Sequence, residues 1–124
     1  MGISNSRVLV FAESGEAAAA IAFWAGAAGH DVVAADSEDA AARALRAQHP
    51  DIVFSSHPWP RGAAMPTLSA LKAARPSLRF VFVMDGPDAA AEAPLARAAG
   101  ADAVLARPLE RAAILRQIEA ARRP

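Results

Sequence analysis

The sequence of 124 residues contains no cysteine and no tyrosine, and Lys72 is its only lysine. Without cysteine the chain cannot form disulfides, thiolate metal sites or thiol nucleophiles, and a reducing cytosol is the compartment we expect. Thirteen basic residues balance thirteen acidic ones, so no net field attracts nucleic acid or an anionic membrane. We therefore expect a cytoplasmic protein that binds neither.

Long hydrophobic runs are also missing. The longest, residues 17–28, is shorter than a membrane span and lacks the basic start of a secretion signal. A chain of this length fits one domain with a buried core. We predict a flexible N-terminus at residues 1–6 and a single domain at residues 7–123.

Short apolar runs alternate with segments of helical periodicity along the whole chain. The runs have the composition of buried parallel strands, and they cover residues 7–12, 31–35, 51–55, 80–84 and 103–106. The segments that follow them predict helices at residues 16–28, 38–48, 66–75, 93–99 and 109–121. This alternation predicts an α/β fold: a three-layer, doubly wound (βα)5 domain around a five-stranded parallel sheet.

Several local predictions follow from single residues. Helical spacing places Ala28 and Ala74 on the inner sides of the first and third helices. Pro94 interrupts an alanine-rich segment, so the helix there is expected to start near Ala93 or to be kinked, after a turn at residues 85–88. Asp102 is interpreted as part of a solvated face.

In an open doubly wound sheet, ligands bind beyond the carboxyl ends of the strands. Five short sequences therefore hold the candidate site: residues 12–14, 36–37, 56–57, 84–85 and 107–108.

Several short motifs lie at or near these strand ends. They are Arg7-Val8-Leu9-Val10, Pro50-Asp51-Ile52-Val53, Pro60 four residues after Ser56, Ala99-Gly100-Ala101-Asp102, and Arg107-Pro108. In this order and at this spacing the chain resembles the receiver domain of bacterial response regulators, from Arg7 to about Arg122. The resemblance implies a receiver-like, flavodoxin-type fold and a role in two-component signal transduction.

The resemblance also implies a pocket whose functional residues have changed. Where the family has an acidic pair that holds Mg²⁺, this chain has Ala12 and Glu13. Where the family has its phosphoacceptor aspartate, this chain has Ser56. The remaining substitutions are Met84 for a threonine or serine, Arg107 for an invariant lysine and Val104 for the switch aromatic.

These changes remove the chemistry of phosphoryl acceptance. Mg²⁺ is usually retained by one or two carboxylates with phosphate oxygens, and only Glu13 remains for it. The hydroxyl of Ser56 is a weak nucleophile unless a base activates it. We expect no catalytic residue, no metal and no cofactor, and we expect Arg107 to form an ion pair with Glu13.

Large aromatic side chains indicate where a partner protein could bind. Trp59 lies in a loop between two prolines, and tryptophan is enriched at binding hot spots. Trp24 and Phe23 are adjacent on the first helix, so one is expected in the core and the other near the surface. We consider Trp59, Trp24 and Phe23 as candidate interface residues.

The leading hypothesis is a pseudo-receiver that acts by protein–protein interaction, independently of phosphorylation. Its expected partners are a histidine kinase, another receiver, an output domain or a second copy in a homodimer. The alternatives are a flavodoxin-like nucleotide- or flavin-binding domain, a receiver-like domain modified on Ser56, and a transition-metal site of Glu13, His57 and Asp85. Two carboxylates in Glu13-Ser14-Gly15-Glu16 disfavour the nucleotide site, because they repel phosphate at a helix start.

Overall fold

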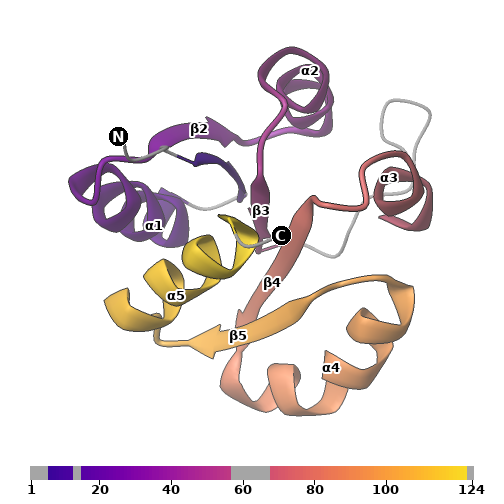
Figure 1. Ribbon diagram of the computed structural model, residues 1–124. Helices are drawn as coiled ribbons and strands as arrows, with labels where there is room; N and C mark the ends of the chain where they lie inside the picture. The colour runs from indigo at the N-terminus through magenta and orange to yellow at the C-terminus, as the bar shows by residue number, and fades with distance from the viewer. Residues whose placement is uncertain (1–5, 13–14, 57–67, 123–124) are drawn as a thin grey trace.

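The computed structural model describes residues 6–12, 15–56 and 68–122. Within this part of the chain, five strands alternate with five helices (Figure 1). The strands are β1 (Arg7–Phe11), β2 (Asp31–Ala35), β3 (Ile52–Ser55), β4 (Arg79–Asp85) and β5 (Ala103–Arg107). The helices are α1 (Gly15–Ala27), α2 (Glu38–Gln48), α3 (Leu68–Ala74), α4 (Gly86–Ala99) and α5 (Arg111–Arg122).

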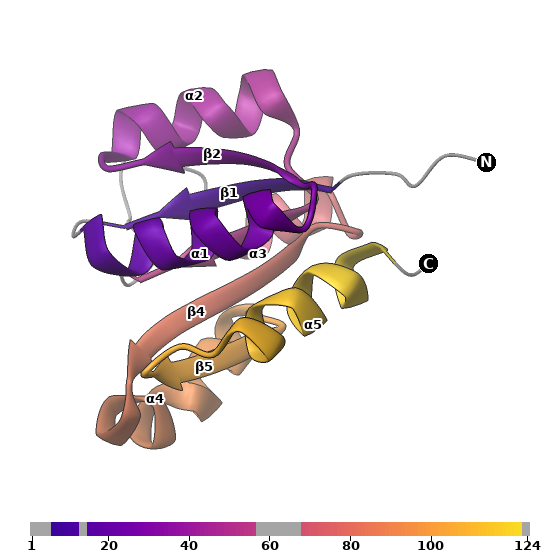
Figure 2. The same ribbon diagram turned by 90° about the vertical axis from the view of Figure 1, so that its left-hand side faces the viewer.

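All strands of the sheet are parallel, in the order β2-β1-β3-β4-β5. Helices α1 and α5 cover one face, and α2, α3 and α4 cover the other (Figures 1 and 2). The strand order reverses between β1 and β3, which is where such sheets place their ligand sites. The predicted three-layer (βα)5 architecture is therefore confirmed.

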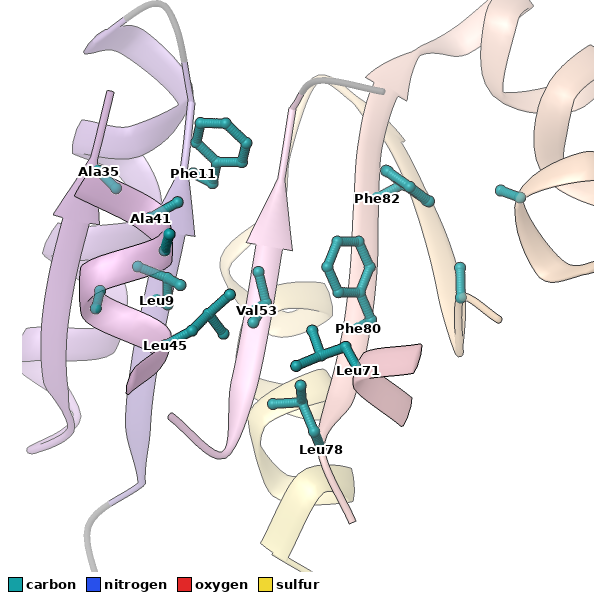
Figure 3. Packing of buried hydrophobic residues seen from close by; sticks show 14 residues of the cluster. Leu9, Phe11, Ala35, Ala41, Leu45, Val53, Leu71, Leu78, Phe80 and Phe82 are labelled. Atoms are coloured by element: carbon teal, nitrogen blue, oxygen red, sulfur yellow. The ribbon is translucent and has the colours of Figure 1, made fainter. Parts of the chain in front are cut away.

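The core has two halves because successive strand residues point to opposite faces of the sheet. Val8 and Val10 of β1 face α1 and α5, whereas Leu9 and Phe11 face α2, α3 and α4. Figure 3 shows the second half, with Phe11 at the carboxyl end of β1 and Phe82 in the middle of β4. We call these two halves the α1/α5 core and the α2/α3/α4 core.

Helix α2 begins and ends where its sequence indicates. Ser37 is the N-cap, and its Oγ accepts a hydrogen bond from Ala40 N at 3.1 Å. Ala41 and Leu45 face the core as expected. At the other end His49 adopts a left-handed conformation (φ 49°) before Pro50.

Helix α1 buries Ala17, Ile21 and Ala25 against the sheet. The prediction that Ala28 faces inward is wrong: α1 ends at Ala27, and Ala28 is exposed. Phe23 is exposed and its neighbour Trp24 is half-buried against the α1/α5 core. Among the helices of the described residues, none has both the length and the apolar composition to span a membrane.

Helix α4 corrects a second prediction, because it runs from Gly86 to Ala99 through Pro94. The predicted turn at residues 85–88 is also wrong, since β4 passes directly into α4. Pro87 lies in the first turn, where no N–H is needed. Pro94 leaves the carbonyl of Ala90 without its helical donor, but both residues are exposed, so water can satisfy that carbonyl.

Helix α3 is anchored at its carboxyl end. Leu71 is buried, while Ala74, which was expected to face inward, is exposed. Lys72 Nζ donates to the carbonyl of Leu78 and to Asp102 Oδ2, both at 2.7 Å. The interpretation of Asp102 as merely solvated is wrong, because this carboxylate joins α3 to the start of β5.

Ser6 precedes β1 and is held in place. Its N–H donates to His30 Nδ1 at 3.1 Å, and its carbonyl accepts from Asp31 N at 3.1 Å. Only 2% of Ser6 is exposed, so this residue of the predicted N-terminal segment is part of the packed domain. Residues 1–5 of that segment lie outside the described residues.

Candidate functional site

The carboxyl ends of β1 and β3 lie side by side and bring two of the predicted site positions together. Phe11 is in register with Ser55, and Ser56 N donates to the carbonyl of Phe11 at 3.0 Å. On the other side of β1, Ala12 N donates to the carbonyl of Ala35 at 3.1 Å. The backbones of Ala12 and Ser56 are therefore fixed next to each other at the edge predicted for the site.

Ala12 is part of the hydrophobic core rather than part of a polar pocket. It is 5% exposed and packs in the α1/α5 core with Val10 and Phe54. An ionised carboxylate in such a place would need a metal or a cation, because burying an unpaired charge is costly. The alanine methyl group has no such requirement and contributes apolar area.

Ser56 follows the last residue of β3 and is half-buried. A hydroxyl here carries no charge at neutral pH, and attack on a phosphoryl group would need a general base. The neighbouring His57 lies outside the described residues, as does Glu13.

Met84 and Val104 lie on the same face of adjacent strands. Val104 is in register with Phe82, and Met84 is in register with Ala106, so Met84 and Val104 are diagonal neighbours. Both are half-buried and pack against the α2/α3/α4 core. Neither side chain can make the hydroxyl hydrogen bond that a threonine or tyrosine would make here.

Arg107 ends β5 in register with Asp85 of β4. It is half-buried, and the peptide bond to Pro108 is cis. Its side chain begins at the same edge of the sheet as Ser56 and Met84. The predicted ion pair with Glu13 lies outside the described residues.

Groups of metal-binding side chains were sought among the described residues. Across residues 6–12, 15–56 and 68–122, no three histidine, aspartate or glutamate side chains are grouped as metal ligands. The alternative set of Glu13, His57 and Asp85 includes two residues outside this part of the chain, and the Asp85 side chain is not described either. Trp59 also lies outside it.

Ser55 is a buried polar residue that the sequence analysis did not single out. It is 0% exposed, and it stands in register between Phe11 of β1 and Phe82 of β4. With Ala35 and Val104 these residues form one row across the face of the sheet. The alternation of β3 could have revealed this, because Val53 and Ser55 must share a face.

Comparison with known proteins identifies the fold. No protein-family model and no curated protein matches the sequence. A response-regulator receiver domain from Clostridium thermocellum matches in structure with a TM-score of 0.76 and 22% identity, covering 94% of this chain and 93% of that one. A response-regulator protein from Burkholderia multivorans matches with a TM-score of 0.75 and 20% identity, and 98% of each chain is covered.

The same fold also occurs within a longer protein. NtrX from Brucella abortus matches with a TM-score of 0.75 and 22% identity, but the match covers 95% of this chain and only 28% of NtrX. The chain thus spans nearly all of two similar proteins and about a quarter of a third. It has the fold of response-regulator receiver domains, as the sequence motifs predicted.

Proposed function

We propose that this chain is a pseudo-receiver: a signalling module of a two-component-type pathway that binds other proteins without being phosphorylated. The observation that carries the proposal is the pair of neighbouring strand ends at Ala12 and Ser56. The hydrogen bond from Ser56 N to Phe11 O fixes these positions together, and neither side chain is a carboxylate.

The chemistry of the pair supports this proposal. Phosphorylation on a carboxylate requires a carboxylate nucleophile, and Ser56 offers a hydroxyl. Mg²⁺ requires hard oxygen ligands in near-octahedral geometry, and the methyl group of Ala12 supplies none. Ala12 is 5% exposed, so this position contributes a buried methyl group where a cation would need an oxygen ligand.

The second pair, Met84 and Val104, supports a module with one conformation. A switch that responds to a phosphoryl group needs a side chain that contacts the group and a second one that moves in response. Met84 and Val104 instead pack together with the α2/α3/α4 core. Neither side chain has a polar group that could form a new hydrogen bond, so their packing gives no reason to expect a second conformation.

The proposed partners are proteins: a histidine kinase, another receiver, an output domain or a second copy. Phe23 and Trp24 make α1 one candidate contact surface, and the α4 to α5 side is the other. The balanced charge of the chain supports neither nucleic acid nor membrane binding, and we place the module in the cytosol.

Amide NMR shifts test the loss of the pocket chemistry. Mg²⁺ and then beryllofluoride, a phosphoryl mimic, are added to the ¹⁵N-labelled chain, and acetyl phosphate is tested separately by intact-mass analysis. We expect no shifts centred on Phe11, Ala12, Ser56 and Arg107, and no added phosphoryl mass. Saturable shifts at these residues, or a phosphorylated chain, would contradict the proposal.

A matched variant shows that the experiment can detect a working site. The double substitution Ala12→Asp and Ser56→Asp places carboxylates on the same two backbone positions. We expect this variant to gain Mg²⁺-dependent shifts at these positions while the wild type does not. Partner capture with and without beryllofluoride then tests the second half of the proposal, which requires the same bound proteins in both samples.

A further inference from the structure

Ser6, the residue before β1, is held at the amino-terminal edge of the sheet by two backbone hydrogen bonds. Its carbonyl accepts from Asp31 N at 3.1 Å, and its N–H donates to Nδ1 of His30 at 3.1 Å. Ser6 is buried, and its Oγ is buried without a hydrogen-bond partner among the described residues. The backbone of Ser6, rather than its hydroxyl, therefore attaches it to the domain, and one of its two bonds ends on an imidazole.

The bond from Ser6 N fixes the protonation state of the half-buried His30. A backbone N–H can only donate, so Nδ1 must offer its lone pair, and the ring must be neutral with its proton on Nε2. A proton on Nδ1 would place two N–H donors opposite each other. The N–H of the buried Ser6 would then lose its acceptor, which costs free energy. The folded chain thus favours the neutral ring over the protonated one.

The imidazole differs from the other acceptors that hold the starts of β1, β2 and β3. Asp31 N donates to the carbonyl of Ser6, and Asp51 N donates to the carbonyl of Arg7 at 2.9 Å. Backbone carbonyls do not titrate. Arg7 N donates to Asp51 Oδ2 at 2.8 Å, and a carboxyl group keeps acceptor capacity even when it is protonated. Of these acceptors, the imidazole alone loses its acceptor atom when it binds a proton.

The charged groups on the surrounding elements have both signs and are exposed. Helix α1 and the turn after it have no charged residue from position 17 to position 29. At the starts of the strands, Arg7 favours the neutral ring, whereas Asp31 and Asp51 favour the protonated one. All three are exposed, so water and salt screen them. On α5, which covers the same face of the sheet as α1, the charged side chains that the structure describes are exposed as well: Arg111, Arg116 and Glu119.

We propose that His30 is a pH-sensitive contact that attaches Ser6 to the turn between α1 and β2. In the neutral form, Nδ1 accepts the Ser6 N–H and supports the start of β1. In the protonated form, Nδ1 carries a proton and this bond is lost. Because the Ser6 carbonyl still accepts from Asp31 N, acid loosens this edge of the sheet without detaching it. The contact lies at the edge opposite the candidate site, and the proposal does not depend on the proposed function.

The pH range of the effect follows from the unfolded chain, in which a histidine has a pKa of about 6.5. The bond from Ser6 N stabilises the neutral ring, so we expect folding to lower the pKa of His30. The contribution of the bond to stability is then complete above about pH 6.5 and is lost as the pH falls through the lower pKa of the folded state. From about pH 7.5 to about pH 5.5, His30 should raise the unfolding equilibrium constant about five- to tenfold.

Long-range ¹H–¹⁵N NMR of the histidine rings in the full chain tests the protonation state directly. At about pH 7.5 we expect the His30 ring to carry its proton on Nε2, and we expect it to titrate below about pH 6.5. The amide signal of Ser6 should shift with the same midpoint. A ring with its proton on Nδ1, a midpoint at or above about pH 6.5, or a Ser6 amide that does not follow the titration would overturn the inference.

Urea denaturation at the same two pH values measures the effect on stability. His30→Asn is the matched variant, because its Oδ1 can replace Nδ1 as the acceptor and does not titrate. We expect His30→Asn to remove the five- to tenfold effect. We expect Ser6→Ala, which keeps the N–H, and His49→Asn, which changes an exposed histidine, to retain it.

Equal pH dependence of the wild type and His30→Asn would overturn the inference, as would loss of the effect in Ser6→Ala. If His30→Asn does not fold, the NMR titration of the wild type decides. Neither measurement involves Mg²⁺ or a phosphoryl mimic, so a failure here leaves the test of the proposed function unchanged.

Discussion

Substitution of Asp102 by alanine tests how the start of β5 is joined to β4. A single carboxylate oxygen, Oδ2, accepts from Phe80 N at 2.8 Å and from Lys72 Nζ at 2.7 Å. Asp102 N in turn donates to the carbonyl of Phe80 at 2.8 Å. The Asp102 side chain thus acts as an extra acceptor at the amino-terminal end of the β4–β5 pairing.

The expected loss of stability follows from these bonds. A hydrogen bond to a charged acceptor contributes about 1.5–3 kcal/mol. The ion pair with Lys72 is partly exposed, with side-chain exposures of 23% and 28%, so it adds only about 0–1 kcal/mol. Asp102→Ala should therefore lower the free energy of unfolding by roughly 1.5–4 kcal/mol, a large part of a typical domain's stability.

Urea denaturation and thermal melting followed by circular dichroism measure this loss. For a chain of this size the melting temperature should fall by roughly 5–20 °C. Lys72→Met is the matched control, because it removes the ion pair and the bond to Leu78 but leaves Asp102 Oδ2 as an acceptor for Phe80. By the same rules its loss should be about 1.5–4 kcal/mol, because the bond to the Leu78 carbonyl also has a charged partner. Asp102→Ala made in the Lys72→Met background should therefore still cost about 1.5–3 kcal/mol, the contribution of the Phe80 bond alone. If the second substitution costs nothing in that background, the reasoning about the Phe80 bond is refuted.

Three further substitutions test other parts of the fold by urea denaturation. Gly26→Ala should raise the free energy of unfolding by about 0.5–1 kcal/mol, because the added Cβ meets no atom within 4 Å. A loss of stability would contradict this reasoning. Ser37→Ala should lower the free energy of unfolding by about 1 kcal/mol, because Ala40 N loses its acceptor. Ser37→Asp keeps an acceptor for Ala40 N and should lose less. Equal losses for the two variants would argue against the N-cap. Phe54→Ala should lower the free energy of unfolding by about 3–5 kcal/mol, since Phe54 is 0% exposed. A loss below about 1 kcal/mol would contradict this, because it would mean that the core closes around the cavity.

The candidate site was predicted residue by residue, because a parallel sheet places all its carboxyl ends at one edge. Ala12 and Ser56 were expected there from strand order alone, and the hydrogen bond from Ser56 N to Phe11 O brings them together. The functional roles assigned to Ala12 and Ser56 stay predictions, as do those of Glu13, Met84, Val104, Arg107 and the candidate interface residues. Ser55 was not singled out as a site residue, although the predicted strand over residues 51–55 already places it on the same face as Val53. The register then shows it between two phenylalanines.

Helix α4 shows where local sequence rules were insufficient. A proline inside a helix removes one hydrogen bond, and this made a short or kinked helix the natural expectation at Pro94. The structure accommodates the proline because Ala90 and Pro94 are exposed, where water can reach the carbonyl that loses its helical donor. Whether a residue faces solvent depends on how its helix docks, which no local pattern specifies.

The sequence by itself determined the alternation of strands and helices, and with it the parallel sheet and the edge at which the candidate site is expected. Periodicity and turn residues act within a few positions along the chain, so they can be recognised without knowing the fold. Only the tertiary structure decided that Asp102 bonds to Lys72 and Phe80. Only the tertiary structure decided that Phe23, rather than Trp24, faces outward. These outcomes depend on contacts between segments far apart in sequence and on the angle at which each helix meets the sheet.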